Sequence, residues 1–414
     1  MGEYGMVIVG AGEAGVRAAL ELRDQGWKGT ITVVGDENQL PYERPPLSKY
    51  QLYTEEEQAP VTIAAQEKLN EYGIRLLSGE TAVNLDRSSH FIELASGRLI
   101  FYERLLLATG ARPRQLNVKG GGAKDALYLR KFADAVKLRD RLQPGQHIAI
   151  IGGGFIGLEV AASSIRKGCR VTLIEVGPRI LMRGVPKEIA DRVELLHRNA
   201  GVEFKIGNMI EYIVRVGGGY AITLADGSLV ESDVVLAGIG AIPETTLAEA
   251  GGLDTDNGIK ADEYLRTSDP DIFAAGDCCS FPHPLYGGRR IRLEAWRNAQ
   301  DQGAHVAANM LGGNTPYVGI PWFWSDQYDE TLEVTGLTDG SETNVHRNVG
   351  SSGQLIFHLA QDGRLVSASG IGSEGTISKD LRLAEKLIAA KAVPNLAELT
   401  DPGFKLRELL RSIS

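Results

Sequence analysis

Two copies of the spacing Gly-x-Gly-x-x-Gly contain the residues whose types and order point most directly to chemistry. Their members are Gly10, Gly12, Gly15, Gly152, Gly154 and Gly157. Each copy follows an apolar run and opens a helical run, and an acid comes later, Asp36 after the first copy and Glu175 after the second. In such a turn the first glycine permits a tight bend, the second lets the backbone approach a pyrophosphate, and the third lets helix and strand pack closely. We therefore expect two dinucleotide-binding sites, in which the acid can accept a hydrogen bond from a ribose hydroxyl.

Strand-turn-helix-strand units must position these residues. In the second copy, residues 148–151 and 171–174 are apolar strands on either side of the helical run. In the first copy we expect the helix to extend from about Gly12 to Gln25 and to stop at Gly26. A lone glycine motif often occurs by chance, but the complete context of strand, turn, helix, strand and acid is specific.

A second internal repeat closes each of these units. Residues 94–113 match residues 224–243 at a constant offset of 130. The shared residues, numbered in the first copy, are Leu94, Ala95, Gly97, Leu99, Leu106, Gly110, Ala111 and Pro113. Both stretches predict a hairpin followed by an apolar strand that ends in glycine, Gly110 in the first copy and Gly240 in the second. The repeat predicts two domains of one design, followed from Val318 by a smaller α+β domain.

Other stretches offer further polar groups. The stretch LPYERPPLSKYQL includes Arg44 and Lys49, and its prolines argue against regular helix or central strand. We expect an ordered loop there, with a solvated connection as the alternative. In DIFAAGD, residues 272–275 predict a short buried strand that places Asp277 at the edge where α/β sheets bind ligands. A helix is expected at about 293–311.

Composition and charge narrow the class of protein. A chain of 414 residues is too long for one ordinary core, and a net charge of −9 argues against general nucleic-acid binding. No run of about 18 apolar residues occurs, so we expect no membrane-spanning helix. The first strand begins at Met6 without a basic segment and cleavage site, which favours a cytoplasmic location. The three cysteines, Cys169, Cys278 and Cys279, offer neither a disulfide framework nor a zinc spacing, and we expect no metal site.

Six short motifs carry a resemblance to a known family. In chain order they are VIVGAGEAG, YERPPLSK, LLLATGARP, IIGGGFIGLEVA, DIFAAGD and WFWSDQ. Together they resemble the FAD-dependent NAD(P)H:ferredoxin reductases of bacterial oxygenase systems, the family of putidaredoxin reductase and of the reductase components of aromatic dioxygenases. The resemblance implies a glutathione-reductase-like α/β fold. Its FAD-binding domain would comprise residues 1–111 and 240–318, its NADH-binding domain residues 112–239, and its C-terminal α+β domain residues 319–414.

The resemblance also implies which residues bind each cofactor. Those implied for FAD are Gly10, Gly12, Gly15, Asp36 or Glu37, Arg44, Lys49, Thr109, Gly110, Asp277 and Trp296. Those implied for NADH are Gly152, Gly154, Gly157, Glu159, Glu175 and Gly240. Because a carboxylate repels a 2′-phosphate, Glu175 favours NADH over NADPH, whereas the nearby Arg179 and Arg183 argue for the opposite preference.

The expected chemistry follows from a missing thiol. Related disulfide reductases carry a cysteine pair, and related peroxidases a single cysteine, in the stretch that here reads LPYERPPLSKYQL and contains none. The flavin itself would therefore take a hydride from NADH and pass electrons singly to a [2Fe–2S] ferredoxin. Lys49 and Glu159 are implied as an ion pair that positions and tunes the reactants, and Trp324, like Trp296, as an aromatic border of the flavin. The alternatives are a capping or surface role for Glu159 and ordinary packing for both tryptophans.

The partner implied by the resemblance is a ferredoxin that serves a haem-thiolate monooxygenase or a Rieske dioxygenase. An acidic ferredoxin needs a local basic surface, and the stretch GGRRIRLEAWR offers one, with a solvated face as the alternative. Its cations are Arg289, Arg290, Arg292 and Arg297. A rubredoxin reductase of the same fold and an apoptosis-inducing-factor-like flavoprotein with a signalling role are alternative functions. We expect a monomer or a weak dimer.

Overall fold

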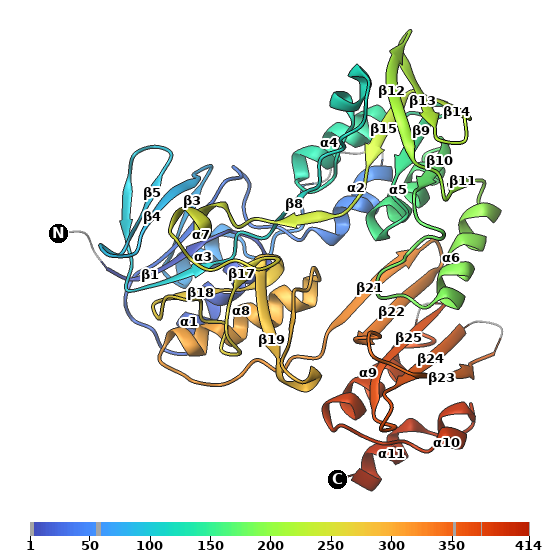
Figure 1. Ribbon diagram of the computed structural model, residues 1–414. Coiled ribbons are helices and arrows are strands. Elements are labelled where there is room, and N and C mark those ends of the chain that lie inside the picture. Colours follow the sequence, from blue (N-terminus) through green and yellow to red (C-terminus); the bar gives the residue numbers. More distant parts are fainter. Residues whose placement is uncertain (1–3, 55–58, 351–352, 374, 414) are drawn as a thin grey trace. The chain divides into compact units, whose positions relative to one another are not determined.

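The computed structural model describes residues 4–54, 59–350, 353–373 and 375–413 (Figure 1). They form two compact units, each assembled from separate stretches of chain. The first unit contains the stretches up to residue 44, 59–112 and 241–319, and the second unit contains the stretches from residue 45, 113–240 and from 320 onward. No helix among the described residues combines the length and the apolarity that a membrane span needs.

A five-stranded parallel sheet forms the centre of the first unit, in the order β18-β7-β1-β2-β3. Its strands are β1 (Met6–Val9), β2 (Ile31–Gly35), β3 (Ile74–Ser78), β7 (Arg104–Leu107) and β18 (Ile272–Ala274). Strands β1, β2 and β18 are buried along their whole length, as a parallel sheet covered on both faces requires. The register pairs Leu107 with both Val9 and Ala274, so the residues that follow these three strands share one edge of the sheet.

Helices α1 (Glu13–Asp24) and α8 (Trp296–Met310) pack against each other in this unit (Figure 1). The contact is close, because a Cβ added at Gly303 would lie 2.4 Å from the carbonyl oxygen of Ala14. The smaller elements of the unit are α3 (Gln66–Glu71), β4 (Ala82–Asp86), β5 (Phe91–Leu94), β6 (Leu99–Phe101), α7 (Thr246–Ala250), β17 (Ile259–Lys260), η3 (Gly276–Cys278), β19 (Cys279–His283), η4 (Pro284–Tyr286) and β20 (Arg289–Ile291).

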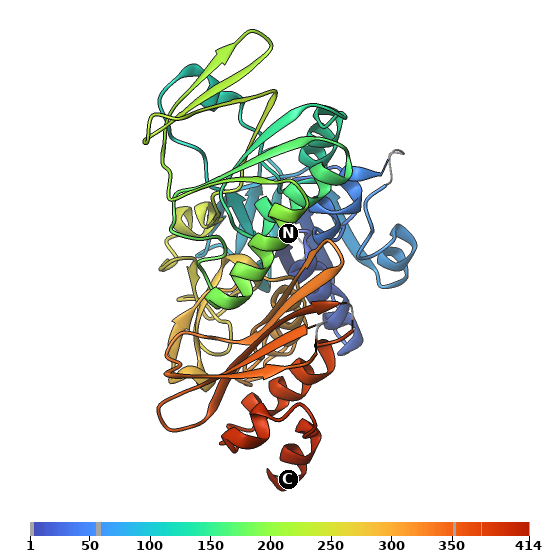
Figure 2. The ribbon, with the colours of Figure 1, turned by 90° about the vertical axis from the view of Figure 1, so that its right-hand side faces the viewer.

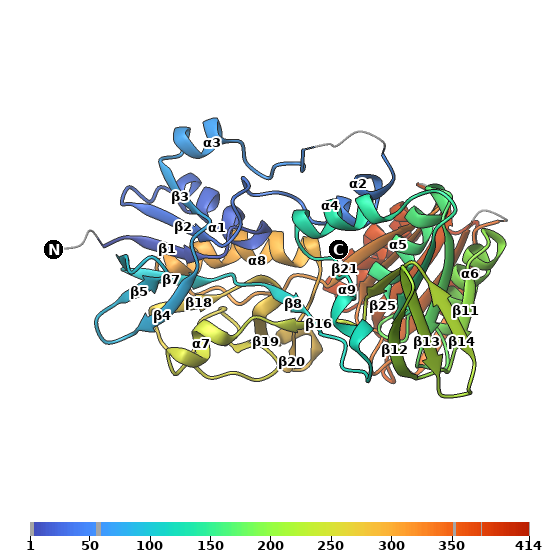
Figure 3. The ribbon, with the colours of Figure 1, turned by 90° about the horizontal axis from the view of Figure 1, so that it is seen from above.

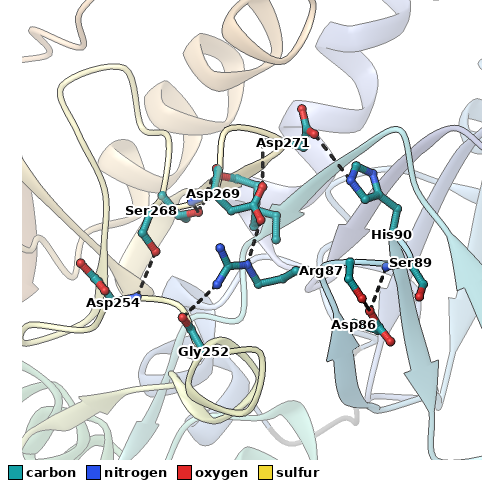
Figure 4. A network of polar contacts seen from close by, with 12 residues as sticks. Asp86, Arg87, Ser89, His90, Gly252, Asp254, Ser268, Asp269 and Asp271 are labelled. Carbon is teal, nitrogen blue, oxygen red and sulfur yellow. Dashed lines mark hydrogen bonds and ion pairs between the residues drawn. The ribbon is translucent and has the colours of Figure 1, made fainter.

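A polar network ties the β4–β5 turn to the segment that leads into β18 (Figure 4). The Arg87 guanidinium donates to Asp269 at 2.8 Å and to the carbonyl oxygen of Gly252 at 3.0 Å. Asp271 lies between Arg104 and His90, whose Nε2 is 3.7 Å from the Asp271 carboxylate. These contacts hold the start of β18, and therefore the turn that carries Asp277 after it.

The chain passes between the units through two short strands, β8 (Ala111–Pro113) and β16 (Ala241–Pro243), which pair with each other. The amide of Glu244 donates to the carbonyl of Gly110 at 2.9 Å, and the amide of Arg114 donates to that of Gly240, also at 2.9 Å. The glycines that end the two repeats therefore take part in equivalent backbone bonds.

A four-stranded parallel sheet, in the order β11-β10-β9-β15, forms one part of the second unit. Its strands are β9 (His147–Ile151), β10 (Arg170–Glu175), β11 (Glu203–Ile206) and β15 (Val234–Ala237). Helices and smaller elements around it are η1 (Pro45–Ser48), α2 (Tyr50–Tyr53), η2 (Gly121–Asp125), α4 (Phe132–Arg141), α5 (Phe155–Arg166), α6 (Lys187–Asn199), β12 (Ile210–Val216), β13 (Gly219–Leu224) and β14 (Leu229–Ser232). Helix α2 contacts both α4 and α5 (Figure 3).

The C-terminal part of the second unit is an antiparallel sheet in the order β21-β22-β25-β24-β23 with three helices. Its elements are β21 (Trp322–Gln327), β22 (Glu330–Gly336), β23 (Thr343–Asn348), β24 (Gly353–Leu359), β25 (Leu365–Ser373), α9 (Ser378–Ala389), α10 (Leu396–Thr400) and α11 (Leu406–Ile413). Figure 2 shows the red helices gathered beside the orange sheet, and one apolar core joins them to it.

The predicted α/β architecture is confirmed, and the two repeats have matching hairpins. Leu94 accepts from the amide of Gly97 at 2.8 Å, and Leu224 accepts from the amide of Gly227 at 2.9 Å. The stretch LPYERPPLSKYQL differs from the expected loop because it includes η1 and the one-turn helix α2. Pro45 and Pro46 lie in the first turn of η1, where a missing amide proton costs little. The stretch is also divided between the units, after Arg44.

Candidate functional site

The first glycine turn has one glycine that the fold does not require. Gly10 has a φ of +118°, and a Cβ there would lie 2.0 Å from the carbonyl oxygen of Ala108. A Cβ at Gly15 would lie 1.9 Å from the carbonyl oxygen of Gly10. Gly12, by contrast, has an ordinary φ of −86° and no atom within 4 Å of its Cβ position. It is the N-cap of α1, so the open space lies where the helix N-terminus attracts an anion.

The second turn repeats this pattern. Gly152 has a φ of +106°, and its Cβ would lie 2.4 Å from the carbonyl oxygen of Gly238. A Cβ at Gly157 would lie 2.2 Å from the carbonyl oxygen of Gly152. Gly154 caps α5 with a φ of −85° and has nothing within 4 Å of its Cβ position. Both turns therefore fit a pyrophosphate, since each keeps open a space that any side chain would fill.

The two acids after β2 differ in their surroundings. Asp36 is exposed directly after the strand. Glu37 accepts hydrogen bonds from the Tyr42 hydroxyl at 2.6 Å and from the Arg44 guanidinium at 3.0 Å. The cation of Arg44 also lies 5.4 Å from the centre of the Tyr42 ring. Glu37 therefore holds Arg44, and Asp36 lies exposed at the end of β2.

Glu13 is an acid of the first turn that sequence reasoning missed. It is the first residue of α1, directly after Gly12, and accepts from Gln300 of α8 at 3.2 Å. Burial raises the pKa of the Glu13 carboxyl above its ordinary value, while the bond from Gln300 opposes that shift. Burial therefore disfavours the charged form of this carboxyl.

The other predicted flavin residues follow the shared edge of the first sheet. The Thr109 hydroxyl donates to the carbonyl oxygen of Glu244 at 2.5 Å, so Thr109 fixes the crossing strands. Asp277 lies half-buried in η3, and the preceding amide, of Gly276, donates to Gln302 of α8 at 2.7 Å. Trp296 is the first residue of α8.

The acid of the second turn is fixed by the backbone. The two carboxylate oxygens of Glu175 accept from the amides of Gly153 and Gly177, each at 2.6 Å. Each oxygen keeps further acceptor capacity, so the carboxylate can still receive a ribose hydroxyl. Its negative charge is held beside Gly153, which directly precedes Gly154 in the turn.

The neighbouring arginines have different surroundings. The guanidinium of Arg179 donates at 2.9–3.0 Å to three backbone carbonyls, those of Ile180, Leu181 and Val185. Arg179 is therefore occupied by its own loop. Arg183 is exposed, and its Nη2 lies 3.2 Å from the Cβ position of Gly240.

Lys49 and Glu159 meet in the second unit. Lys49 Nζ lies 3.3 Å from the Glu159 carboxylate, 3.4 Å from that of Asp326 and 5.6 Å from the centre of the Trp324 ring. Glu159 is only 6 % exposed, so it is a buried charge rather than a surface group. Its two oxygens also accept from the hydroxyls of Ser48 and Ser325. No spacing in the sequence pointed to either serine.

The three cysteines are buried. Burial raises the pKa of Cys169 and Cys278, and it raises that of Cys279 well above its ordinary value. The thiol of Cys278 donates to the carbonyl oxygens of Leu107 and Ala275 at 3.4 Å. A protonated, buried thiol is a poor nucleophile, so none of the three suits redox relay.

The four arginines of the predicted basic surface differ in their hydrogen bonds and in their exposure. Arg290 donates to the carbonyls of Ala261 and Ser280 at 2.9 and 2.5 Å. Arg292 has an 8 % exposed side chain that bonds the carbonyl of Asp277 and the carboxylate of Glu294. The remaining two cations are more accessible. They are Arg289, which is exposed, and Arg297, which pairs with Asp301 at 3.5 Å.

Comparison with known proteins agrees with this geometry. The family model for pyridine nucleotide-disulphide oxidoreductases matches residues 4–303, and a reductase C-terminal model matches residues 322–410. The ferredoxin–NAD(+) reductase component of the anthranilate 1,2-dioxygenase system of Burkholderia cepacia is 40 % identical over 407 residues, which cover 98 % of each chain.

Two solved structures have closely similar folds. The ferredoxin reductase for the CYP199A2 system of Rhodopseudomonas palustris has a TM-score of 0.91 and 36 % identity, covering 97 % of this chain and 98 % of its own. The covalent putidaredoxin reductase–putidaredoxin complex has a TM-score of 0.92 and 34 % identity, covering 100 % and 99 %. The chain therefore belongs to the pyridine nucleotide-disulphide oxidoreductase family and, within it, to the ferredoxin reductases of bacterial oxygenase systems.

Proposed function

We propose that the protein takes electrons from NADH and passes them, through FAD, to a ferredoxin that serves an oxygenase. The observation that carries this proposal is the pair of open spaces at Gly12 and Gly154, in a chain whose thiols are all buried. Two pyrophosphate cradles call for two dinucleotides. FAD, when bound, supplies the conversion between hydride transfer and single-electron transfer.

The first unit would hold FAD. Gly10, Gly12 and Gly15 shape its pyrophosphate cradle, and Asp36 accepts from its ribose. Thr109, Gly110 and Asp277 follow strands that end at one sheet edge, Trp296 begins α8, and all four would contact the rest of the molecule. Arg44, fixed by Glu37, supplies a positive charge for the phosphates. The role of the α8 N-terminus is electrostatic, because its dipole favours a negative charge in front of Trp296.

The second unit would hold NADH in preference to NADPH. Glu175 places a fixed negative charge where a 2′-phosphate would lie, and Arg179 is occupied by three carbonyls. These contacts argue against Arg179 as a phosphate ligand, whereas Arg183 is exposed. The values of kcat/KM for the two cofactors test the preference, and a higher value for NADPH would refute it.

Lys49 and Glu159 would position the reactants rather than transfer protons. The Glu159 carboxylate receives only donors, namely two hydroxyls and the ammonium of Lys49. These contacts use the carboxylate oxygens as acceptors and fix the orientation of the carboxylate, which suits a positioning role. Trp324, beside Lys49, would border the flavin on the acceptor side.

The ferredoxin would dock through cations near Trp296, of which Arg289 and Arg297 are the accessible members. A second cationic surface lies on the C-terminal helices, where a pocket of about 530 Å³ is lined by Lys379, Arg382, Lys386 and Arg407. Double charge reversal at Arg289 and Arg297 should raise KM for ferredoxin about tenfold and leave ferricyanide reduction unchanged. The matched control is Lys379→Glu with Arg382→Glu, and an effect of the control alone would move docking to the C-terminal helices.

A stopped-flow assay tests the function itself. NADH-reduced holoprotein is mixed with a panel of [2Fe–2S] ferredoxins and with rubredoxin. At least one ferredoxin should be reduced faster than oxygen. Faster reduction of rubredoxin would favour the rubredoxin reductase alternative. A long-lived reduced complex that reduces no acceptor would favour an apoptosis-inducing-factor-like role.

We further propose that the chain acts as a monomer or weak dimer in the cytoplasm, where NADH is regenerated. Sedimentation velocity at micromolar concentration and cell fractionation test these two points. A tight higher oligomer or a membrane-associated fraction would contradict them.

A further inference from the structure

A buried hydrogen-bond chain ends on Glu159 in the second unit. Ser325 and Gln327 are two residues apart on β21, so they point to the same side of the strand, and both are fully buried. The Ser325 hydroxyl donates to Glu159 at 2.5 Å, and the side-chain amide of Gln327 donates to Ser325 Oγ at 2.9 Å. The amide oxygen of Gln327 lies 2.8 Å from Nε2 of His197, on α6.

The tautomer of His197 fixes the direction of this chain. An amide oxygen only accepts, so Nε2 of His197 must carry the proton and Nδ1 must accept. The Tyr328 hydroxyl lies 3.2 Å from Nδ1 and can supply that bond. Burial keeps both groups in the required form, because it lowers the pKa of His197 to about 4 and raises that of Tyr328 to about 12. Every donor, from Tyr328 to Ser325, therefore points toward the carboxylate.

The backbone at Tyr328 is strained in a way that serves this arrangement. Tyr328 has a φ of +58° in the tight turn between β21 and β22. A bulky residue in the left-handed region is costly and persists where the surroundings hold it. Here its ring contacts the His197 ring at a centroid distance of 4.9 Å, and its hydroxyl reaches Nδ1.

We propose that Ser325, Gln327 and His197 are positioning residues that hold Glu159 in place for its contact with Lys49. This inference rests on the proposed function, in which Lys49 and Glu159 position the reactants. Aligned hydrogen bonds polarise one another, so the chain strengthens the bond that reaches the carboxylate. It does not suit proton relay, because the amide of Gln327 interrupts it with a group that does not readily exchange its proton along the chain.

Two variants interrupt the hydrogen-bond chain at different points. Ser325→Ala deletes the donor to Glu159 and should lower kcat for NADH-dependent ferricyanide reduction about tenfold, with KM for NADH nearly unchanged. Gln327→Met keeps the shape but deletes the second bond, and should lower kcat about threefold. The control is Ser367→Ala, since Ser367 is a buried serine of the same C-terminal sheet that donates to the carbonyl oxygen of Thr335 at 2.8 Å. It should lower the melting temperature without changing kcat.

A double-mutant cycle separates positioning from general support of the fold. If Ser325 acts through Glu159, Ser325→Ala should have almost no further effect on kcat in a Glu159→Met background. The same cycle in urea unfolding of the cofactor-free protein should show coupling between the two residues. Additive losses in kcat, an unchanged kcat in Ser325→Ala, or absent coupling in unfolding would each overturn the proposal. If the wild type itself is not reduced by NADH, the proposed function fails. The double-mutant cycle in urea unfolding still tests the hydrogen-bond chain in that case.

Discussion

Gly12 and Gly154 occupy equivalent places in the two units, and they differ from the glycines on either side of them. Each has an ordinary φ and an empty Cβ position, whereas Gly10 and Gly152 need a positive φ and Gly15 and Gly157 would collide with backbone. The fold therefore explains four of the six glycines. The fold gives no such reason for the remaining two, and their open Cβ positions support the proposal that a ligand approaches them.

The units diverge at the acid that follows the turn. Asp36 is exposed after β2, while Glu175 is held by two amides after β10. A fixed carboxylate can discriminate between cofactors because it cannot turn away from a 2′-phosphate. We propose that the turn determines that a dinucleotide binds, and that the fixed carboxylate of Glu175 favours NADH over NADPH.

The largest expected effect comes from filling the two open spaces. Gly12→Val should fold normally, because its φ suits any residue, but should lose FAD during purification. Gly154→Val should keep FAD and raise KM for NADH about a hundredfold, because the pyrophosphate loses its backbone contacts. Flavin absorbance and steady-state kinetics check both variants. Loss of FAD from Gly154→Val, with its stability intact, would break the assignment of one cofactor to each unit.

The next effect concerns cofactor preference. Glu175→Gln removes the negative charge and keeps an acceptor, so the ratio of kcat/KM for NADH to that for NADPH should fall about thirtyfold. Asp36→Asn is the matched change in the first unit and should leave that ratio unchanged. Equal effects of the two variants would contradict the division of roles.

Acid should weaken the second unit first. Burial lowers the pKa of His197 and His358, both in that unit, from 6.5 to about 4. Each contributes stability that is present above pH 6.5 and lost as the pH falls toward 4, on the order of 3 kcal/mol per histidine. In the first unit burial lowers the pKa of one histidine, His283, against three in the second unit, His147, His197 and His358, so the first unit should respond less. Hydrogen exchange at pH 7 and pH 5 should show a greater loss of protection in α6 and β24 than in β1, and equal losses would argue against this account.

The smallest effect is expected at the thiols. The raised pKa values of Cys169, in the second unit, and Cys278, in the first, leave less thiolate near pH 8 than a free cysteine has. Iodoacetamide should label the native protein slowly and the unfolded protein fast, as measured by mass spectrometry. Rapid native labelling together with loss of NADH-dependent reduction would point to a thiol relay.

The structural features that could be predicted from the sequence are those that depend on local spacing. The two turns, the hairpins at an offset of 130 and the strand before Asp277 follow from glycine positions and apolar runs within about 30 residues. Arg290 and Arg292 were predicted together with Arg289 and Arg297 as a basic surface, and their guanidinium groups also bond backbone carbonyls. Nothing in a run of arginines distinguishes the two situations, so their docking role remains a prediction without structural support.

The surroundings of Glu159 could not be predicted, because its partners are remote in the chain. Ser48 is 111 residues away and Ser325 is 166 residues away. Both are common residue types without a diagnostic spacing. Their alignment depends on how α5, η1 and β21 pack in the second unit, which is a property of the tertiary fold rather than of any local pattern.

In the proposed function, FAD is the centre that stores electrons between NADH and the acceptor. An anaerobic titration of the holoprotein with NADH, followed by flavin absorbance, tests this most directly. FAD stores one electron pair, so one equivalent of NADH should complete the reduction. A requirement for two equivalents would reveal a second two-electron centre, such as a disulfide, and would contradict the account.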